Sequence, residues 1–133
     1  MARFIIWFVA LDWIVFGAMH FTGHEQTVLQ MPDFVPPAWR SPLVYLSGAL
    51  EVSAGVLILA GGRWRRIGAM LSILLLIGLA PAILYITFTD KAYLAGAVLN
   101  TVFRFAVLPH ALLIGWLSVR IWRSTPPPPS PRA

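Results

Sequence analysis

The sequence predicts an all-α membrane protein, a bundle of four transmembrane helices. Of its 133 residues, 59% are hydrophobic and only 11% are charged, whereas about 25% of the residues of a soluble domain are charged. Four apolar segments also use nearly the whole chain, and each is close to the roughly 20 residues that cross a hydrocarbon core of about 30 Å. We therefore expect one transmembrane domain over residues 1–123, followed by a Pro-rich tail over residues 124–133.

The first apolar segment covers residues 4–21 and contains Asp12. Arg3 gives it a short basic start, as in a signal peptide. Asp12 interrupts the apolar run, however, the segment is long for a signal core, and no small-x-small cleavage site precedes the following polar loop. We therefore expect this segment to be retained as a helix.

Residues 22–42 separate the first two apolar segments and include four prolines. Proline fixes the backbone near an extended form and removes a hydrogen-bond donor. This composition predicts an ordered, non-helical turn region. Its apolar residues Phe34, Val35 and Trp39 are expected to lie back on the bundle as a lid over the outer mouth.

The second and third apolar segments cover residues 43–60 and 67–88 and are joined by a short GGRWRR connection. Because this connection is short, the two helices should be antiparallel neighbours. The glycines of the connection are expected to end the helix of the second apolar segment. Trp64 is expected to anchor the connection at the membrane interface. Pro81 removes one helical hydrogen bond, which predicts a kink that opens a small cavity.

The last apolar segment covers residues 102–122, but the chain is already apolar from residue 93. Thirty residues at about 1.5 Å each exceed one membrane crossing. Either residues 93–100 lie along the outer surface or the helix projects beyond the bilayer. Residues 124–133 contain four consecutive prolines, which predicts an extended, disordered tail in the cytoplasm.

The distribution of basic residues predicts that both termini are cytoplasmic. With four spans drawn, Arg104 lies near a helix end and only Arg40 and Lys91 lie on the outer side. The remaining basic residues lie on the other side: Arg3, Arg63, Arg65, Arg66, Arg120, Arg123 and Arg132. Positive charge marks the cytoplasmic side, and anionic lipid headgroups account for the net charge of +5 without a nucleic-acid partner. We expect a multi-pass protein of a bacterial inner (cell) membrane.

Six residues are candidates for a ligand pocket in the outer half of the bundle: Asp12, His20, Glu51, Pro81, Arg104 and His110. A carboxylate at the centre of a transmembrane helix costs roughly 2.5 to 3.5 kcal/mol on insertion scales, so it should face protein or water. The helical rise places both carboxylates and His110 near the membrane middle, and His20 and Arg104 near the outer boundary, with Pro81 between these layers. We expect Arg104 to pair with one of the carboxylates.

Four interpretations of this cluster remain open. The polar groups could serve only to hold the helices together, with close approach allowed by a group of small residues: Gly48, Ala49, Ser53, Ala54 and Gly55. They could instead form a pocket for a quinone, a sterol or a lipid. A proton or ion pathway is disfavoured because the chain has no internal repeat of the kind seen in transporters. A metal site would rest on His20, His24, His110 and Glu51, with His20 and His24 one turn apart, but His24 follows Gly23 and we predict no metal.

Several kinds of catalytic chemistry are absent from the chain. It contains no cysteine, which excludes thiol relays, disulfide exchange and cysteine-ligated metals within it. It also shows no nucleophile with an adjacent base, no phosphate loop and no nucleotide fingerprint. The sequence therefore favours a protein that is not an enzyme in its own right.

Four short motifs resemble the DoxX family of small four-helix membrane proteins. They are GAMHF over residues 17–21, FVPP over residues 34–37, GALE over residues 48–51 with Gly55, and the pair Pro81 and Ala82. The resemblance covers roughly residues 10–120. It differs in that Ile83 and Leu108 stand where many relatives have an asparagine and a glutamine.

The resemblance implies a DoxX-like four-helix domain and two kinds of role. One is an accessory component of a membrane redox system that binds a quinone or lipid near Glu51. The other is a non-enzymatic assembly or chaperone-type protein for a partner in the membrane. The first is our leading hypothesis.

Overall fold

The structure is a computed structural model that describes residues 3–89 and 97–126. These residues form five helices and no strand: α1 (Arg3–Thr22), α2 (His24–Gln30), α3 (Pro37–Ala60), α4 (Gly62–Phe88) and α5 (Ala97–Ser124). All except α2 are long and apolar enough to cross a membrane. The prediction of an all-helical chain with four such helices is confirmed.

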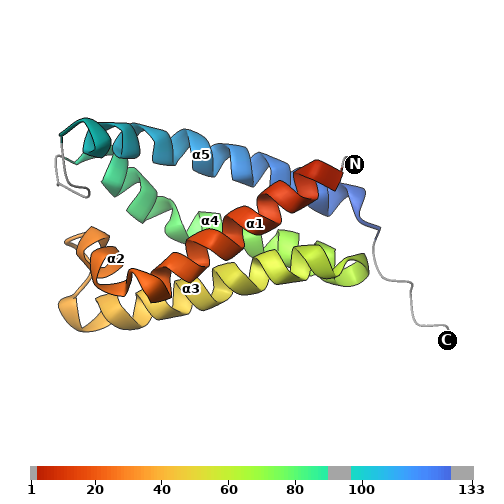
Figure 1. Ribbon diagram of the computed structural model, residues 1–133, viewed down its shortest axis with the longest axis horizontal. Helices are drawn as coiled ribbons and strands as arrows, with labels where there is room; N and C mark the ends of the chain where they lie inside the picture. The colour runs from red at the N-terminus through yellow and green to blue at the C-terminus, as the bar shows by residue number, and fades with distance from the viewer. Residues whose placement is uncertain (1–2, 90–96, 127–133) are drawn as a thin grey trace.

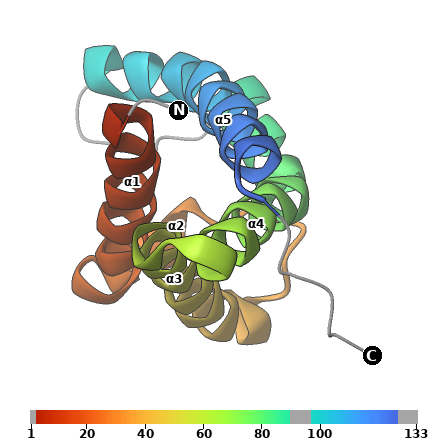
Figure 2. The same cartoon turned by 90° about the vertical axis from the view of Figure 1, so that its right-hand side faces the viewer.

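The four long helices form a ring in the order α1, α3, α4 and α5 (Figures 1 and 2). Packing is extensive between α1 and α3, α3 and α4, and α4 and α5, whereas α1 and α5 contact each other much less. The start of α1, the α3–α4 connection and the end of α5 lie at one end of the bundle (Figure 1). We call this the arginine end, after Arg63, Arg65 and Arg66, and the opposite end the α2 end.

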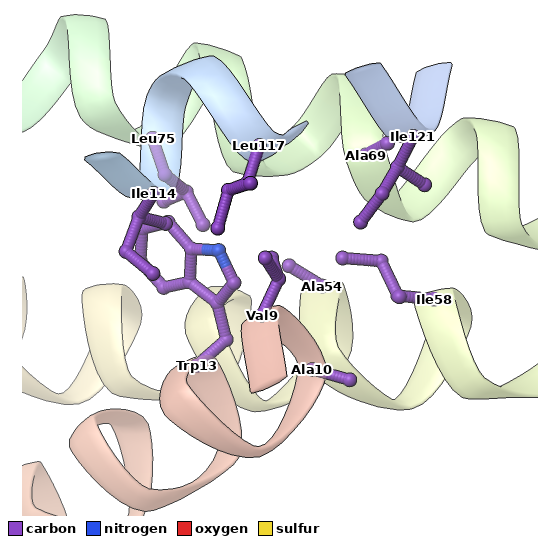
Figure 3. Packing of buried hydrophobic residues seen from close by; sticks show 10 residues of the cluster. All are labelled: Val9, Ala10, Trp13, Ala54, Ile58, Ala69, Leu75, Ile114, Leu117 and Ile121. Atoms are coloured by element: carbon purple, nitrogen blue, oxygen red, sulfur yellow. The ribbon is translucent and has the colours of Figure 1, made fainter. Parts of the chain in front are cut away.

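The buried apolar core lies in the half of the bundle nearer the arginine end. Figure 3 shows its members: Val9, Ala10, Trp13, Ala54, Ile58, Ala69, Leu75, Ile114, Leu117 and Ile121. At most 33% of the apolar window of any long helix is buried inside the bundle. Large apolar side chains therefore cover the outer surface, as a lipid environment favours.

Glycines bring α1 and α3 into backbone contact. A Cβ atom built at Gly17 would lie 2.8 Å from the Gly48 carbonyl oxygen, and one at Gly55 would lie 2.5 Å from the Ala10 carbonyl oxygen. Because lipid supplies no hydrophobic force between helices, such close packing is a main source of their association. This contact fixes the depth of α1 residues relative to α3 residues.

The predicted set of small packing residues in the second apolar segment is only partly right. Gly48, Ala54 and Gly55 are buried, but Ala49 and Ser53 are exposed. The helical repeat of 3.6 residues explains the difference, since Ala49 and Ser53 lie on the outer face of α3.

The prediction of a non-helical region over residues 22–42 was wrong. Residues His24–Gln30 form α2, and α3 already begins at Pro37, which places Pro42 inside a helix. Proline is well suited to the first helical position, because the amide hydrogen that it lacks has no helical partner there. Only residues 31–36 remain as a loop between α2 and α3.

The α3–α4 connection is shorter than expected. Gly61 alone separates the two helices, and its φ of +78° lies in the left-handed region that favours glycine. The Arg65 Nε donates a hydrogen bond to the Ile58 carbonyl oxygen at 3.1 Å. This side chain thus satisfies one of the carbonyls left free at the end of α3.

Helix α4 changes direction along its length (Figure 1) and contains Pro81. An internal proline is the usual cause of such a bend.

The start of the last apolar stretch falls partly outside the described residues, which resume at Ala97. From there the chain is helical, and 28 residues correspond to about 42 Å, which is longer than the hydrocarbon core. Residues 97–100 therefore belong to α5, while residues 93–96 lie outside the described part. Of the predicted tail, Ser124 ends α5, and residues 127–133 lie outside the described part.

Candidate functional site

A cavity of about 210 Å³ lies in the α2 half of the bundle, beyond the apolar core. Four of the six predicted pocket residues line it: Asp12, His20, Glu51 and His110. Most of the remaining wall is apolar, with side chains from α3, α4 and α5 such as Val44, Leu76, Ile83, Val107 and Ile114. We call it the polar cavity.

Helical spacing places these side chains on the inner faces of their helices. Asp12, Phe16 and His20 are four residues apart in α1 and all line the polar cavity, as do Ser47 and Glu51 in α3. Residues four apart lie on the same face of a helix, one turn above the other. The close glycine contact of α1 with α3 then brings His20 to the level of Glu51.

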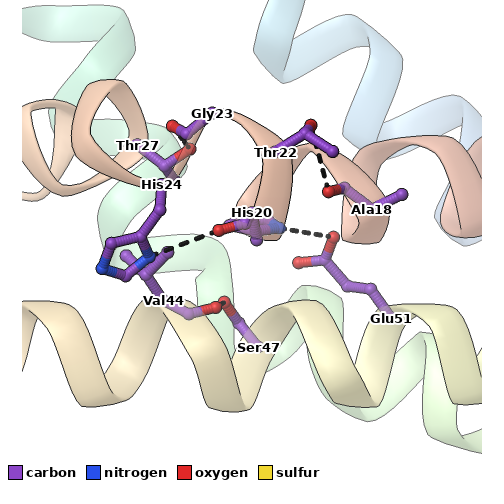
Figure 4. Close-up of polar contacts among 9 residues, drawn as sticks. All are labelled: Ala18, His20, Thr22, Gly23, His24, Thr27, Val44, Ser47 and Glu51. Atoms are coloured by element: carbon purple, nitrogen blue, oxygen red, sulfur yellow. Dashed lines mark hydrogen bonds and ion pairs between the residues drawn. The ribbon is translucent and has the colours of Figure 1, made fainter.

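His20 and Glu51 form the first of two histidine–carboxylate pairs (Figure 4). The His20 Nδ1 lies 3.4 Å from the Glu51 Oε2, and the Glu51 side chain is only 3% exposed. The contact lacks the geometry of a hydrogen bond, since the buried Nδ1 has no hydrogen-bond partner. Within the described part of the chain, this is the one polar contact of the Glu51 carboxylate.

The Glu51 carboxylate is therefore buried with unused hydrogen-bonding capacity. A carboxylate offers about four lone-pair positions to donors, and buried polar groups are normally satisfied by protein or by ordered water. Because Glu51 lines the polar cavity, a polar group placed in the cavity would satisfy it.

Asp12 and His110 form the second pair. The His110 Nε2 lies 3.1 Å from one Asp12 oxygen and 3.2 Å from the other. The pair links α1 to α5, which contact each other much less than the other neighbouring helices of the ring do. The ring of Phe16 lies beside it, with its centroid 5.5 Å from that of His110.

The other two predicted residues lie elsewhere. Contrary to expectation, no ion pair joins Arg104 to Asp12 or Glu51 among the described residues, where each carboxylate contacts a histidine. Arg104 lies six residues before His110, so its side chain is rotated by about 240° around the axis of α5 relative to that of His110. Its guanidinium lies 5.9 Å from the ring centroid of Phe105. Pro81 is exposed and lines a neighbouring cavity instead.

His24 is held away from the carboxylate pairs. Its ring stacks on that of Tyr45 with centroids 3.9 Å apart, and its Nε2 lies 2.9 Å from the Ser41 Oγ. Its Nδ1 lies 3.3 Å from the His20 carbonyl oxygen (Figure 4), which assigns the ring proton to Nδ1 because a carbonyl can only accept. Among the described residues, no three of His, Asp or Glu are grouped closely enough to hold a metal ion.

A buried chain of hydrogen bonds that the sequence did not predict lies beside the cavity. The Trp13 Nε1 donates to the Ser72 Oγ at 2.6 Å, and the Ser72 Oγ lies 2.7 Å from the Ser118 Oγ. Both serines are fully buried, and the chain joins α1, α4 and α5. Since Trp13 lines the polar cavity, these bonds hold one of its walls. A serine in an apolar helix is a weak sequence signal, because it can also bond to its own helix.

We expect Ser72→Val to lower the free energy of unfolding by about 1–3 kcal/mol, because it leaves the Trp13 donor and the Ser118 hydroxyl buried without their partner. Chemical unfolding in mixed detergent micelles, followed by circular dichroism, measures this change. Ser53→Val is the matched control, since the exposed Ser53 bonds to the Ala49 carbonyl of its own helix. Equal losses in the two variants would contradict the prediction.

The chain matches one of the known protein-family models over most of its length. Residues 9–120 match the model of a family described as a domain of unknown function (DUF8561). No curated protein and no solved structure matches the chain. The matched region contains all four residues of the two histidine–carboxylate pairs.

Proposed function

The chain belongs to the family described as a domain of unknown function (DUF8561), and we propose that this member binds an uncharged amphipathic molecule, such as a quinone, in the polar cavity. One observation carries the proposal. The Glu51 carboxylate is 3% exposed, faces the cavity and has a single polar contact among the described residues. Burying such a group is unfavourable unless a donor reaches it.

The lining of the cavity favours an uncharged head group. Its described residues include two carboxylates and two histidines but no lysine or arginine. A phosphate or fatty-acid carboxylate would meet like charge there without a cationic partner, which is unfavourable in a medium of low dielectric constant. An uncharged group with both hydrogen-bond donors and acceptors avoids this penalty.

A quinone head group suits the two pairs chemically. Its carbonyl oxygens accept hydrogen bonds from the histidines, and the hydroxyls of the reduced form donate to the carboxylates. The resemblance to the DoxX family supports an accessory role in a membrane redox system. In this role the chain holds the quinone and a partner protein carries out the electron transfer.

We further propose that the chain is a multi-pass membrane protein with its arginine end in the cytoplasm, which places the polar cavity in the outer half of the bilayer. Three arginines at that end lie over tryptophan rings at 4.6 to 4.9 Å: Arg63 on Trp64, Arg66 on Trp122 and Arg120 on Trp116. Tryptophan is typical of the membrane interface, and arginine of its cytoplasmic side.

Native mass spectrometry of protein extracted gently from its own membrane tests the proposal. The wild type is expected to retain a bound uncharged amphiphile. Glu51→Gln and Asp12→Asn are each expected to lower the bound fraction at least about tenfold, as the loss of a hydrogen bond to a charged group would. Glu25→Gln is the matched control, because Glu25 is exposed on α2 and lies outside the lining of the cavity.

Two results would count against this function. Retention of the same molecule by all three variants would show that it binds elsewhere. A subunit that carries no small molecule but copurifies with another membrane protein, whatever residue stands at position 51, would favour the assembly role.

A further inference from the structure

A second, larger cavity of about 430 Å³ lies between α3 and α4, under the loop that joins α2 to α3. Ser47 is its one hydroxyl-bearing side chain among the described lining residues, and that hydroxyl already donates to the Val44 carbonyl of its own helix. The rest of the wall consists mainly of leucines of both helices, with Pro81 and Gly78. We call it the apolar cavity.

The two cavities adjoin each other. Five residues line both: Met31 and Pro32 of the loop, Ser47 of α3, and Leu79 and Ala82 of α4. Ser47 is one helical turn from Glu51, so the shared wall begins one turn from the buried carboxylate. A molecule whose polar end contacts Glu51 thus has an apolar space next to it.

The loop above the apolar cavity is held by several contacts. The Tyr85 hydroxyl donates to the Asp33 Oδ2 at 2.6 Å, and the Arg40 Nε donates to the Val35 carbonyl oxygen at 2.9 Å. The Phe34 ring packs edge-on against the Tyr85 ring, with centroids 5.7 Å apart. Since Phe34 and Val35 line the cavity, these contacts build its wall before any ligand arrives.

Gly78 makes the α4 side of the apolar cavity open. A Cβ atom built there would meet no atom within 4 Å, in contrast to the tightly packed glycines of the α1–α3 contact. A larger side chain at position 78 can therefore be accommodated by the fold, and it would occupy space that the cavity now leaves free.

We propose that the two cavities form one site for an uncharged amphiphile with a single apolar chain, its head at Glu51 and its tail between α3 and α4. The inference rests on the proposed function and adds the path of the tail. The polar cavity matches the head group of such a molecule, and the adjoining apolar cavity matches its single apolar chain. A tail that left instead between α1 and α5 would have to pass the Asp12–His110 pair, which links those helices.

Photolabelling tests the path of the tail. The probe is a benzoquinone with a long alkyl chain that carries a diazirine near its end, applied to the whole protein in lipid nanodiscs and mapped by peptide mass spectrometry. Saturable labels are expected on α3 and α4, at residues such as Leu46 and Leu74, which line only the apolar cavity. Glu51→Gln is expected to reduce these labels at least about tenfold, because Glu51 lines only the polar cavity.

Filling the apolar cavity gives a second measurement. Gly78→Leu is expected to weaken binding of the long-chain benzoquinone about tenfold or more, while binding of the same ring without its chain stays within about twofold of the wild type. Quenching of tryptophan fluorescence measures both affinities. Ala49→Leu is the matched control, since it adds bulk to an exposed position of α3 that lines neither cavity.

The outcomes separate this inference from the proposed function. Labels on Phe16 or Val107, or labels on α3 and α4 that do not depend on Glu51, would overturn the path of the tail. Equal effects of Gly78→Leu on both ligands would also overturn it. If neither the long-chain nor the chainless quinone binds the wild type, the proposed function itself fails.

Discussion

Gly55→Leu is expected to lower the free energy of unfolding by more than about 3 kcal/mol, the largest stability change that we predict. Overpacking a well-packed core typically costs about 1–3 kcal/mol. Here the obstacle is backbone, because the first added carbon would lie 2.5 Å from the Ala10 carbonyl oxygen and 3.2 Å from the Ile14 amide nitrogen. These atoms can move only if α1 and α3 separate, which removes their whole contact. Chemical unfolding in mixed detergent micelles measures the change.

The same substitution at Gly78 serves as the control. Gly78 also lies inside a long helix, but its Cβ position is open. Leucine has a helix propensity better than that of glycine by roughly 0.8–1 kcal/mol, so Gly78→Leu is expected to be neutral or slightly stabilising. If both variants lose stability equally, the close approach of α1 and α3 is not what holds the bundle together.

His20→Leu is expected to destabilise the protein by about 2–3 kcal/mol, because it removes the one polar partner of a buried carboxyl group and leaves that group without compensation. The carboxylate left behind is that of Glu51, which is 3% exposed and has no second polar contact within the described residues. The unfolding free energy of the variant, measured in the same micelles, gives the magnitude.

A double substitution distinguishes the loss of the polar partner from the loss of packing. Replacing both members of a buried pair by apolar residues is often nearly neutral, so His20→Leu combined with Glu51→Leu is expected to be more stable than His20→Leu alone. His24→Leu in combination with Glu51→Leu is the matched control, since His24 stacks on Tyr45 and has no contact with Glu51. If the change in unfolding free energy of the double variant equals the sum of the changes in the two single variants, His20 and Glu51 are not coupled.

Asp12 and Glu51 were recognisable in the sequence as inward-facing residues, but the residues that pair with them could not be predicted from it. A carboxylate in an apolar helix signals an inward-facing position whatever its partner is. Which side chain meets the carboxylate depends on the relative depth and rotation of two helices. The close contact of α1 and α3 sets the depth and rotation that bring His20 to Glu51. The rotation of α5 about its axis brings His110 to Asp12 and places Arg104 on another face.

In the segment between the first two long helices, local composition did not predict the start of α3. Four prolines in residues 22–42 suggested an extended region, yet two of them, Pro37 and Pro42, lie within α3. Pro37 stands at the helix start, where the amide hydrogen that proline lacks would have no helical partner. Pro42 lies inside the helix. The composition of the segment therefore did not determine where the helix begins.

By itself the sequence determined that the chain has four apolar helices, where each approximately lies, and which carboxylates must face inward. These properties follow from hydrophobicity and from the high free energy of a charge in lipid, which act on each segment separately. Only the tertiary structure decided the histidine partners, the bonds of Trp13 through Ser72 to Ser118, and the two adjoining cavities. They depend on how closely and at what rotation neighbouring helices pack, which arises only from contacts between residues distant in the chain.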